Sequence, residues 1–378
     1  MGDYIIIGAD MVPTERNVRY FIDGKMDEIC GEELIRILNN ANYRIFNLEV
    51  PLSDHSNPIK KFGPSLIAPC AAIKGYEVLN VDLLTLANNH IYDQGETGLE
   101  ETLCTLSEAA ILHVGAARNI EQACKPHTFT FCNKRIGVYA CTEHEFSIAN
   151  NNKGGANPFD PLYSLDHIQD LKKKSDYVIV LYHGGKEEYR YPSPDLQRRC
   201  HRMIEKGADL VLCQHSHCIG CEERYAGGLI VYGQGNFIFD GENNEYWNTS
   251  VLVQIDEKFN VNYIPITKKE EKIALAGLKE KEQILKDFFD RSEKIKDNQY
   301  IGKKYAEISK KQKERYLLAI SGKNRPLIYR IINKLMGHRL DQVHIRRAYG
   351  LRKRIEVENI VNCETHREML IEILRQER

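Results

Sequence analysis

Residues 82–95, DLLTLANNHIYDQG, combine an apolar run with a cluster of polar side chains that follows it directly. The run 83–87 predicts a short buried strand, and it stops at Asn88, Asn89 and His90. In an open α/β sheet, ligands collect beyond the carboxyl ends of the strands. Amide, imidazole and carboxylate groups together can coordinate a metal and transfer a proton. The same residue types after a strand also form turns and helix caps, so this stretch alone leaves both interpretations open.

The rest of the first 267 residues alternates apolar runs with helical periodicity. Strands are expected at 4–8, 43–49, 111–114, 129–131, 135–141, 177–182, 208–213, 229–232, 251–255 and 260–265. Helices are expected at 32–40, 71–76, 98–110, 165–174 and 194–206. Strands that alternate with helices predict an α/β fold with a mostly parallel central sheet.

Charge is distributed unevenly along the chain. The net charge is −1, which does not favour specific nucleic-acid binding, but residues 268–378 contain 28 Lys+Arg against 17 Asp+Glu. Helical periodicity marks this region at 270–296, 303–320, 326–336 and 357–374. We therefore expect an α/β domain at 1–267 and a basic α-helical region at 268–378. The basic residues of 346–354 predict a solvated helix face; contact with an anionic polymer, a membrane surface or a partner protein is the alternative.

The cysteines and the apolar runs indicate a cellular compartment. Eleven cysteines stand at irregular spacing, several of them inside apolar stretches, which is typical of small buried side chains in a reducing environment. The first residues do not have the pattern of a signal peptide, and no run of 18 apolar residues occurs. We expect a cytoplasmic protein without a membrane span.

Five apolar segments end in side chains that can bind a metal: Asp10, Glu49, Asn89 with His90, His183, and His215 with His217. Parallel strands bring their carboxyl ends to one edge of a sheet, so these residues are expected to converge. Each has an ordinary structural interpretation as a helix cap, an exposed strand end or a hydrogen-bonded core histidine. Together they form a mixed nitrogen and oxygen set without thiolate, which suits Mn, Fe or Zn and is large enough for one or two ions.

Six ordered motifs resemble one family of proteins. They are GADM (8–11), NLEVPL (47–52), LANNHIYDQG (86–95), YHGGKEEY (182–189), QHSHCIGCEERYAG (214–227) and VYGQGNFIFD (231–240). In this order they resemble the capsule-synthesis CapA family, the poly-γ-glutamate capsule biosynthesis proteins, which is similar in fold to the calcineurin-like metallophosphatases. The resemblance covers roughly residues 5–263. It implies a metallophosphatase-like layered β-sheet core flanked by helices, followed by the C-terminal helices.

The resemblance also implies roles for particular residues. The implied metal ligands are Asp10, Glu49 (as a bridging carboxylate), Asn89, His183, His215 and His217. His90 matches the catalytic imidazole, Asp93 would orient it, and Glu187 and Asn236 would line the pocket. Three basic residues are further candidates for holding an anionic substrate: Arg16, Lys60 and Lys61.

The sequence departs from the family's pattern at three points, and three functions remain open. Val12 stands where metallophosphatases place a histidine, and Gln214 and Ser216 differ from the usual neighbours of the paired histidines. CapA proteins often carry an N-terminal membrane anchor, which we do not expect in this chain. The first function is metal-dependent hydrolysis of phosphoesterase type, on an anionic small molecule or polymer, in capsule or cell-envelope polymer synthesis. The others are metal-dependent ligation or acid/base chemistry on a peptide or glycan, and a non-catalytic scaffold that binds capsule-synthesis proteins through the basic helices.

The CxxC of Cys218 and Cys221 is a weak zinc or redox signal.

Overall fold

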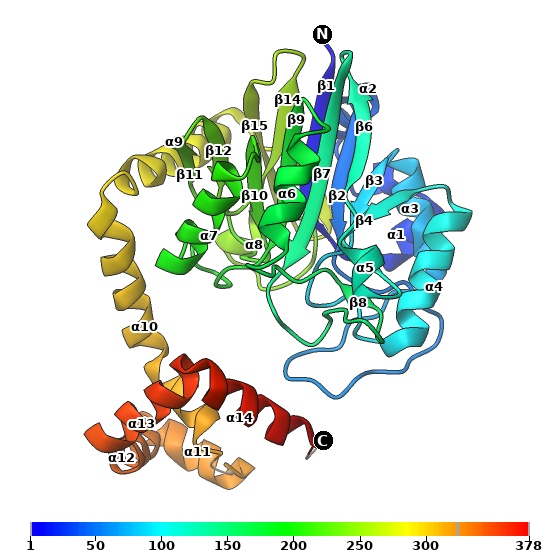
Figure 1. The fold of residues 1–378 in the computed structure, drawn as a ribbon. Helices are drawn as coiled ribbons and strands as arrows, with labels where there is room; N and C mark the ends of the chain where they lie inside the picture. The colour runs from blue at the N-terminus through cyan, green and yellow to red at the C-terminus, as the bar shows by residue number, and fades with distance from the viewer. Residues whose placement is uncertain (1, 323–324, 377–378) are drawn as a thin grey trace. The chain divides into compact units, whose positions relative to one another are not determined.

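The computed structural model describes residues 2–322 and 325–376, and it divides into two compact units, Met1–Gly302 and Lys303–Arg378 (Figure 1). The first unit is built on two large β-sheets. The domain boundary expected at 267/268 stays a prediction, because a division into compact units does not show which residues belong to which functional region.

The larger sheet has eight strands in the order β16-β15-β14-β1-β2-β3-β4, with β13 also paired to β1. Strands β1 to β4 and β13 are parallel to one another, whereas β14 is antiparallel to β1, and β15 and β16 continue the antiparallel pairing. Their bounds are β1 Tyr4–Met11, β2 Tyr43–Leu48, β3 Leu83–Thr85, β4 Leu112–Val114, β13 Asn236–Ile238, β14 Thr249–Asp256, β15 Val261–Lys269 and β16 Lys272–Leu275.

The second sheet has six strands in the order β11-β12-β10-β9-β7-β6, parallel at its centre and antiparallel at both edges. Its strands are β6 His127–Phe131, β7 Lys134–Thr142, β9 Tyr177–His183, β10 Leu210–Gln214, β11 Glu222–Tyr225 and β12 Gly228–Val231. A small pair, β5 Ala116–Ala117 and β8 Gly155–Ala156, stands apart.

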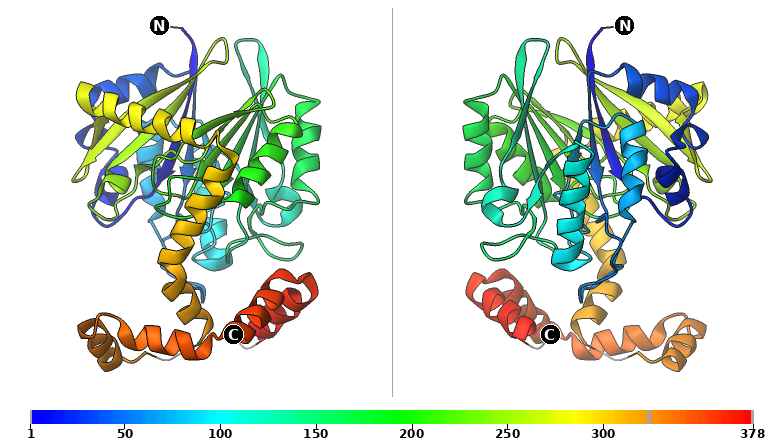
Figure 2. Two further views of the ribbon diagram at one scale, coloured as in Figure 1. Left: turned by 90° about the vertical axis from the view of Figure 1, so that its left-hand side faces the viewer. Right: turned by 90° about the vertical axis from the view of Figure 1, so that its right-hand side faces the viewer.

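Both faces of each sheet are apolar, so the two sheets pack against each other and are covered outside by helices (Figure 2). Because side chains alternate along a strand, Ile5 and Ile7 of β1 enter the core between the sheets, and Ile6 packs under the outer helices. On β9, Ile179 faces the inner core and Val180 the outer one. The layered core with flanking helices is confirmed, but the expectation of one central sheet was wrong.

Helices on the outer faces complete the first unit. Those over the eight-stranded sheet are α1 Val18–Asp23, α2 Glu32–Asn40, α3 Ile73–Val78 and α4 Gly95–Glu108, and those over the six-stranded sheet include α6 Ser164–Lys172 and α7 Pro194–Glu205. The other helices of this unit are α5 Ile120–Ala123, α8 Glu245–Asn248, α9 Leu278–Lys294 and the 3-10 turns η1 Met26–Glu28 and η2 Cys70–Ala72.

The C-terminal part is helical, as expected, with α10 Asn298–Ile320, α11 Leu327–Leu335, α12 Arg339–Ala348, α13 Leu351–Asn362 and α14 Glu364–Gln376. Two sequence expectations were wrong in detail. The helix expected at 270–296 begins only at Leu278, because β16 pairs with β15 before it. The helix expected at 357–374 is interrupted at Cys363, whose backbone is extended. Among the described residues, no helix is both long and apolar enough to span a membrane.

Candidate metal centre

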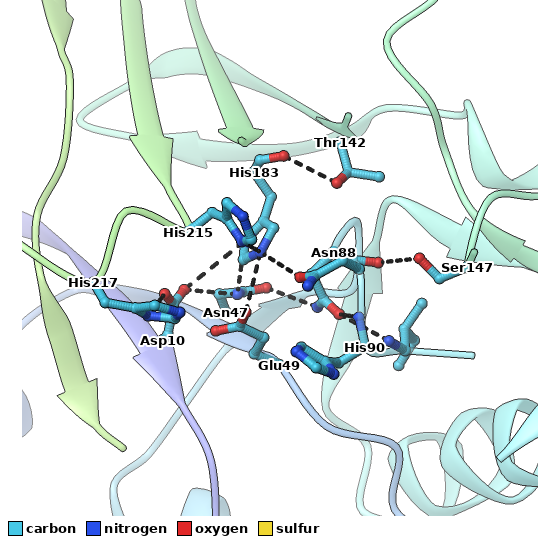
Figure 3. Close-up of polar contacts among 12 residues, drawn as sticks. Asp10, Asn47, Glu49, Asn88, His90, Thr142, Ser147, His183, His215 and His217 are labelled. Carbon is cyan, nitrogen blue, oxygen red and sulfur yellow. Dashed lines mark hydrogen bonds and ion pairs between the residues drawn. The ribbon is translucent and has the colours of Figure 1, made fainter. Parts of the chain in front are cut away.

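The candidate site lies where the carboxyl ends of strands from both sheets meet (Figure 3). Asp10 near the end of β1 is in register with Asn47 on β2 on one side and with Asn236 on β13 on the other. In the second sheet, His183 ends β9 beside Gln214, the last residue of β10. Strands of one sheet therefore present carboxylates and amides, and strands of the other present imidazoles.

His183 Nε2 is the point on which the polar atoms converge. It lies 2.9 Å from Asn89 Oδ1, 3.1 Å from His215 Nδ1 and 3.2 Å from Glu49 Oε1. The contact with Glu49 lacks hydrogen-bond alignment. His183 Nε2 carries at most one proton, so it cannot pair with all three atoms, and nitrogen and oxygen atoms that crowd together in this way are expected of ligands around a cation.

Two groups of side chains could each hold a divalent cation. The ligand atoms of Asp10, Glu49 and His183 lie within 4.8 Å of one another, and so do those of Glu49, His215 and His217. Glu49 belongs to both groups. Asp10 Oδ2 and both carboxylate oxygens of Glu49 are buried and have no hydrogen-bond partner among the described residues. Burying carboxylate oxygens without a hydrogen-bond partner raises the free energy of the folded protein, and a bound cation would supply the missing partner.

The electrostatics of the cluster favour a ligand role. Burial, reinforced for Asp10 by the neighbouring charge of Glu49, raises the pKa of each carboxyl group to about 7. Burial lowers the pKa of His183 to about 4, and it also lowers the pKa of His215. Both imidazoles are therefore neutral at pH 7, with a lone pair available, and a bound cation would displace protons from the carboxyl groups.

Asn47, which was not among the site residues predicted from the sequence, fixes the orientation of the Asp10 side chain. Its Nδ2 donates to Asp10 Oδ1 at 2.7 Å, and its Oδ1 accepts from Thr85 Oγ1 at 2.9 Å and from Asn88 Nδ2 at 3.1 Å. Asn47 is fully buried. The available signal was one amide inside an otherwise apolar strand, two residues before Glu49 and hence on the same face.

The paired histidines are held in an unusual backbone conformation. His215 has φ +86° and His217 has φ +52°, in the left-handed region that residues other than glycine rarely adopt. His217 Nδ1 lies 2.9 Å from Asn236 Oδ1, and its ring stacks on Trp247 with centroids 4.6 Å apart. These contacts hold the His217 imidazole beside Asp10 Oδ2, at 3.8 Å.

His90 lies at the edge of the cluster in a buried proton-transfer arrangement. Its Nδ1 is 2.6 Å from Asp93 Oδ2, so a proton on Nδ1 is donated to Asp93 and Nε2 stays available. Lys61 forms an ion pair with Asp93 Oδ1, and its Nζ is 3.3 Å from His90 Nδ1. Asn88 Oδ1 accepts hydrogen bonds from the backbone N–H groups of His90 and Ile91, which fixes the turn.

The predicted substrate-binding residues occupy different surroundings. Lys61 is buried against Asp93, whereas Lys60 is exposed. Glu187 is 47% exposed in its side chain and lies 3.9 Å from Lys186. Asn236 is fully buried and contacts His217. Arg16 lines a pocket of about 600 Å³.

This pocket adjoins the candidate metal centre through two aromatic rings. Trp247 and Phe239 line it, and both rings also pack against His217. Lys268, buried with its Nζ bonded to the carbonyl of Phe239, supplies a further cationic group to the lining. The pocket therefore combines aromatic, cationic and acidic groups next to a candidate ligand, and its acidic residues are Glu28, Asp240, Glu242, Glu270 and Glu271.

The CxxC shows no sign of reactive chemistry. Cys218 and Cys221 are buried, all eleven cysteines are free thiols, and burial raises the pKa of Cys218 to about 11. A thiol of high pKa is a poor nucleophile and a poor metal ligand. The burial of both side chains favours a structural role as small apolar groups over a zinc or redox site.

Comparison with known proteins places these features in a family. The chain is 30% identical to the capsule biosynthesis protein CapA of Bacillus anthracis over 234 residues, which cover 60% of this chain and 57% of that protein. It is 32% identical to the PGA biosynthesis protein CapA of Bacillus subtilis over 197 residues, half of each chain. The aligned region thus spans little more than half the length of these curated relatives.

Among solved structures, a phosphatase from Mycoplasma pneumoniae aligns at 12% identity with a TM-score of 0.44, over 71% of this chain and 95% of that one. A 5'-nucleotidase precursor from Thermus thermophilus aligns at 14% identity with a TM-score of 0.41, over 76% and 58%. Because both TM-scores lie below 0.5, the assignment rests on sequence. The model of the bacterial capsule synthesis protein PGA_cap family matches residues 8–241, more than half of the chain, and the chain therefore belongs to that family, as its motifs predicted.

Proposed function

We propose that this protein is a metal-dependent hydrolase of phosphoesterase type that acts in the synthesis of a capsule or another cell-envelope polymer. The observation that supports it most strongly is the pair of ligand groups sharing Glu49, next to the His90–Asp93 pair. The biological setting is proposed from the relatives, whose names refer to capsule and PGA biosynthesis.

The first group, Asp10, Glu49 and His183, would hold one divalent ion, with Asn89 Oδ1 beside it. The second, Glu49, His215 and His217, would hold another. Mn, Fe and Zn suit such a mixed nitrogen and oxygen set. When bound, these ions would polarise a phosphoryl oxygen and lower the pKa of water. Val12 is buried and apolar at the position of the missing histidine, so the protein offers few ligands to one of the two ions.

His90 is the proposed general acid. Its Nδ1–H is held by Asp93, which leaves Nε2 to deliver a proton to the leaving oxygen. The Asp93 carboxylate also stabilises the imidazolium form before that transfer. Lys61 balances the charge of Asp93 in a buried setting, where an unpaired carboxylate is costly.

The substrate is proposed to be an anionic small molecule or polymer. The exposed Arg16 and the rings of Trp247 and Phe239 line the pocket beside His217, together with Lys268, Lys272 and five acidic residues. A cation can pair with an anionic group of the substrate, and the rings can cover its apolar part.

The test is an assay of phosphomonoesters and phosphodiesters with protein loaded with Mn²⁺, Fe²⁺ or Zn²⁺. We expect turnover that His90→Ala lowers by about 10²–10⁴-fold. His366→Ala, at an exposed histidine of α14, is the matched control and should retain full activity. If the metal-loaded protein turns over no ester in the panel, the phosphoesterase proposal fails; ligation or acid/base chemistry would remain. A folded protein that binds no metal would instead select the scaffold.

A further inference from the structure

Helix α11 turns its apolar side outward. Asn333 is 4% exposed, whereas Leu335 is 81% exposed. With 3.6 residues per turn, the exposed apolar side chains of this helix fall within an arc of about 140°. These side chains are Leu327, Ile328, Ile331, Ile332 and Leu335. The helix is therefore amphipathic in the opposite sense to an ordinary helix of a folded domain, whose apolar stripe faces the core.

Specific hydrogen bonds fix this orientation. Asp341 of α12 is buried, and its carboxylate accepts from Asn333 Nδ2 at 2.8 Å and from Tyr329 Oη at 2.9 Å. Arg325 adds an ion pair at 3.2 Å. Tyr329 and Asn333 are four residues apart and lie on one face of α11, so this polar face is held against α12. The outward apolar face follows from that pairing.

Basic residues border one side of the apolar face of α11 and follow it along the chain. Between residues 325 and 354 the chain has nine Lys or Arg and one acidic residue, the buried Asp341. On the helical wheel of α11, Arg330 and Lys334 both border the apolar arc on the side of Leu327. The exposed basic residues that follow on α12 and α13 are Arg339, Arg346, Arg347, Arg352, Lys353 and Arg354.

We propose that α11 and the basic residues of 330–354 bind the surface of an anionic phospholipid bilayer. The apolar side chains of α11 would enter the boundary between headgroups and acyl chains, and the Lys and Arg side chains would contact the lipid phosphates. This binding is a separate property from the proposed hydrolase activity, and either can fail without the other.

Other occupants use only part of this surface. A second copy of the chain would bring two strongly basic surfaces together. Moreover, a nine-residue helix is only about 14 Å long, which is short for a stable interface of roughly 800 Å² per partner. A soluble polyanion would pair with the basic residues and leave the apolar arc in water. An anionic bilayer offers an apolar environment to the arc of α11 and phosphate groups to the basic side chains.

The experiment is sedimentation of the full-length protein with phosphatidylcholine vesicles, with and without phosphatidylglycerol. We expect binding only to the anionic vesicles. Ile328→Ser/Leu335→Ser should weaken it at least tenfold, and Arg346→Gln/Arg347→Gln roughly thirtyfold. The control Leu278→Ser, at a 74% exposed leucine of α9, should bind as the wild type does. All these positions are exposed, and circular dichroism checks that each variant is folded.

Three outcomes would overturn the proposal. No binding to anionic vesicles would refute it directly. Binding that depends on the arginines but not on Ile328 and Leu335 would indicate a site for soluble polyanions. A wild-type dimer in solution that Ile328→Ser/Leu335→Ser converts to a monomer, without vesicle binding, would assign the face to a second copy of the chain.

Discussion

Replacing Glu49 by glutamine is expected to stabilise the metal-free protein and to abolish its stabilisation by metal. In the fold, burial raises the pKa of Glu49 to about 7 from its ordinary 4.5. The folded protein therefore holds this proton more tightly than the unfolded chain does. Ionisation of Glu49 costs little stability below about pH 4.5, and its full cost is reached once the pH has risen through about 7.

The magnitude follows from the size of this pKa shift. At about 1.4 kcal/mol per pKa unit, the ionised side chain costs about 3 kcal/mol at pH 8 and less than about 1 kcal/mol at pH 5. In the presence of a chelator, the free energy of unfolding of Glu49→Gln should therefore rise relative to that of the wild type by about 2–3 kcal/mol between pH 5 and pH 8. A cation present at a hundredfold its Kd adds about 2.7 kcal/mol to the wild type, which should offset most of the difference.

Urea unfolding in EDTA and in Mn²⁺, at pH 5 and at pH 8, measures both effects. Glu187→Gln is the matched control, because it makes the same chemical change at an exposed position. Its free energy of unfolding should differ little from the wild type under all four conditions. A Glu49→Gln difference that does not change between pH 5 and pH 8 would refute the electrostatic reasoning. Equal stabilisation of Glu49→Gln and wild type by Mn²⁺ would refute the ligand role.

Three further predictions concern neighbouring groups. Asp93→Asn should lower turnover by about 10²–10⁴-fold and destabilise the fold by about 3–5 kcal/mol, because Lys61 loses its buried partner. The double variant Asp93→Asn/Lys61→Met should recover the stability but not the activity. Full activity of either variant would contradict the proton-transfer role. Asn47→Ala should weaken metal binding about 10- to 100-fold by releasing Asp10, and unchanged affinity in titration calorimetry would contradict this. Because the pKa values of Asp10 and Glu49 are raised to about 7, protons compete with the cation as the pH falls; the Mn²⁺ affinity should drop between pH 8 and pH 6, and a flat profile would count against it.

The candidate ligands could be selected from sequence because each follows a buried apolar run. Asp10, Glu49 and Asn89 come from strands of one sheet, whereas His183 and His215 come from the other. Their convergence was predicted for a single sheet edge, but it occurs between two sheets. Apolar runs do not reveal which strands pair, because pairing depends on contacts far apart in the chain.

The missed features share a physical cause. Asn47 acts through hydrogen bonds to residues of neighbouring strands, and Lys61 reaches Asp93 only because a loop folds over the turn. The short strand β16 lies in a lysine-rich stretch whose few apolar positions also fit a helix. In α11 the periodicity predicted a helix correctly but not its orientation, which the buried Asp341 decides. Each depends on a tertiary contact that local patterns do not contain.

The central claim is that the buried cluster sharing Glu49 holds divalent metal. Its most direct test is the metal content of the purified protein, wild type against Glu49→Ala, with Glu187→Ala as the control, after dialysis against metal-free buffer. Because Glu49 belongs to both ligand groups, we expect one or two ions per wild-type chain, the same in Glu187→Ala, and none in Glu49→Ala. A folded wild-type protein without metal, or a Glu49→Ala variant with unchanged content, would contradict the account.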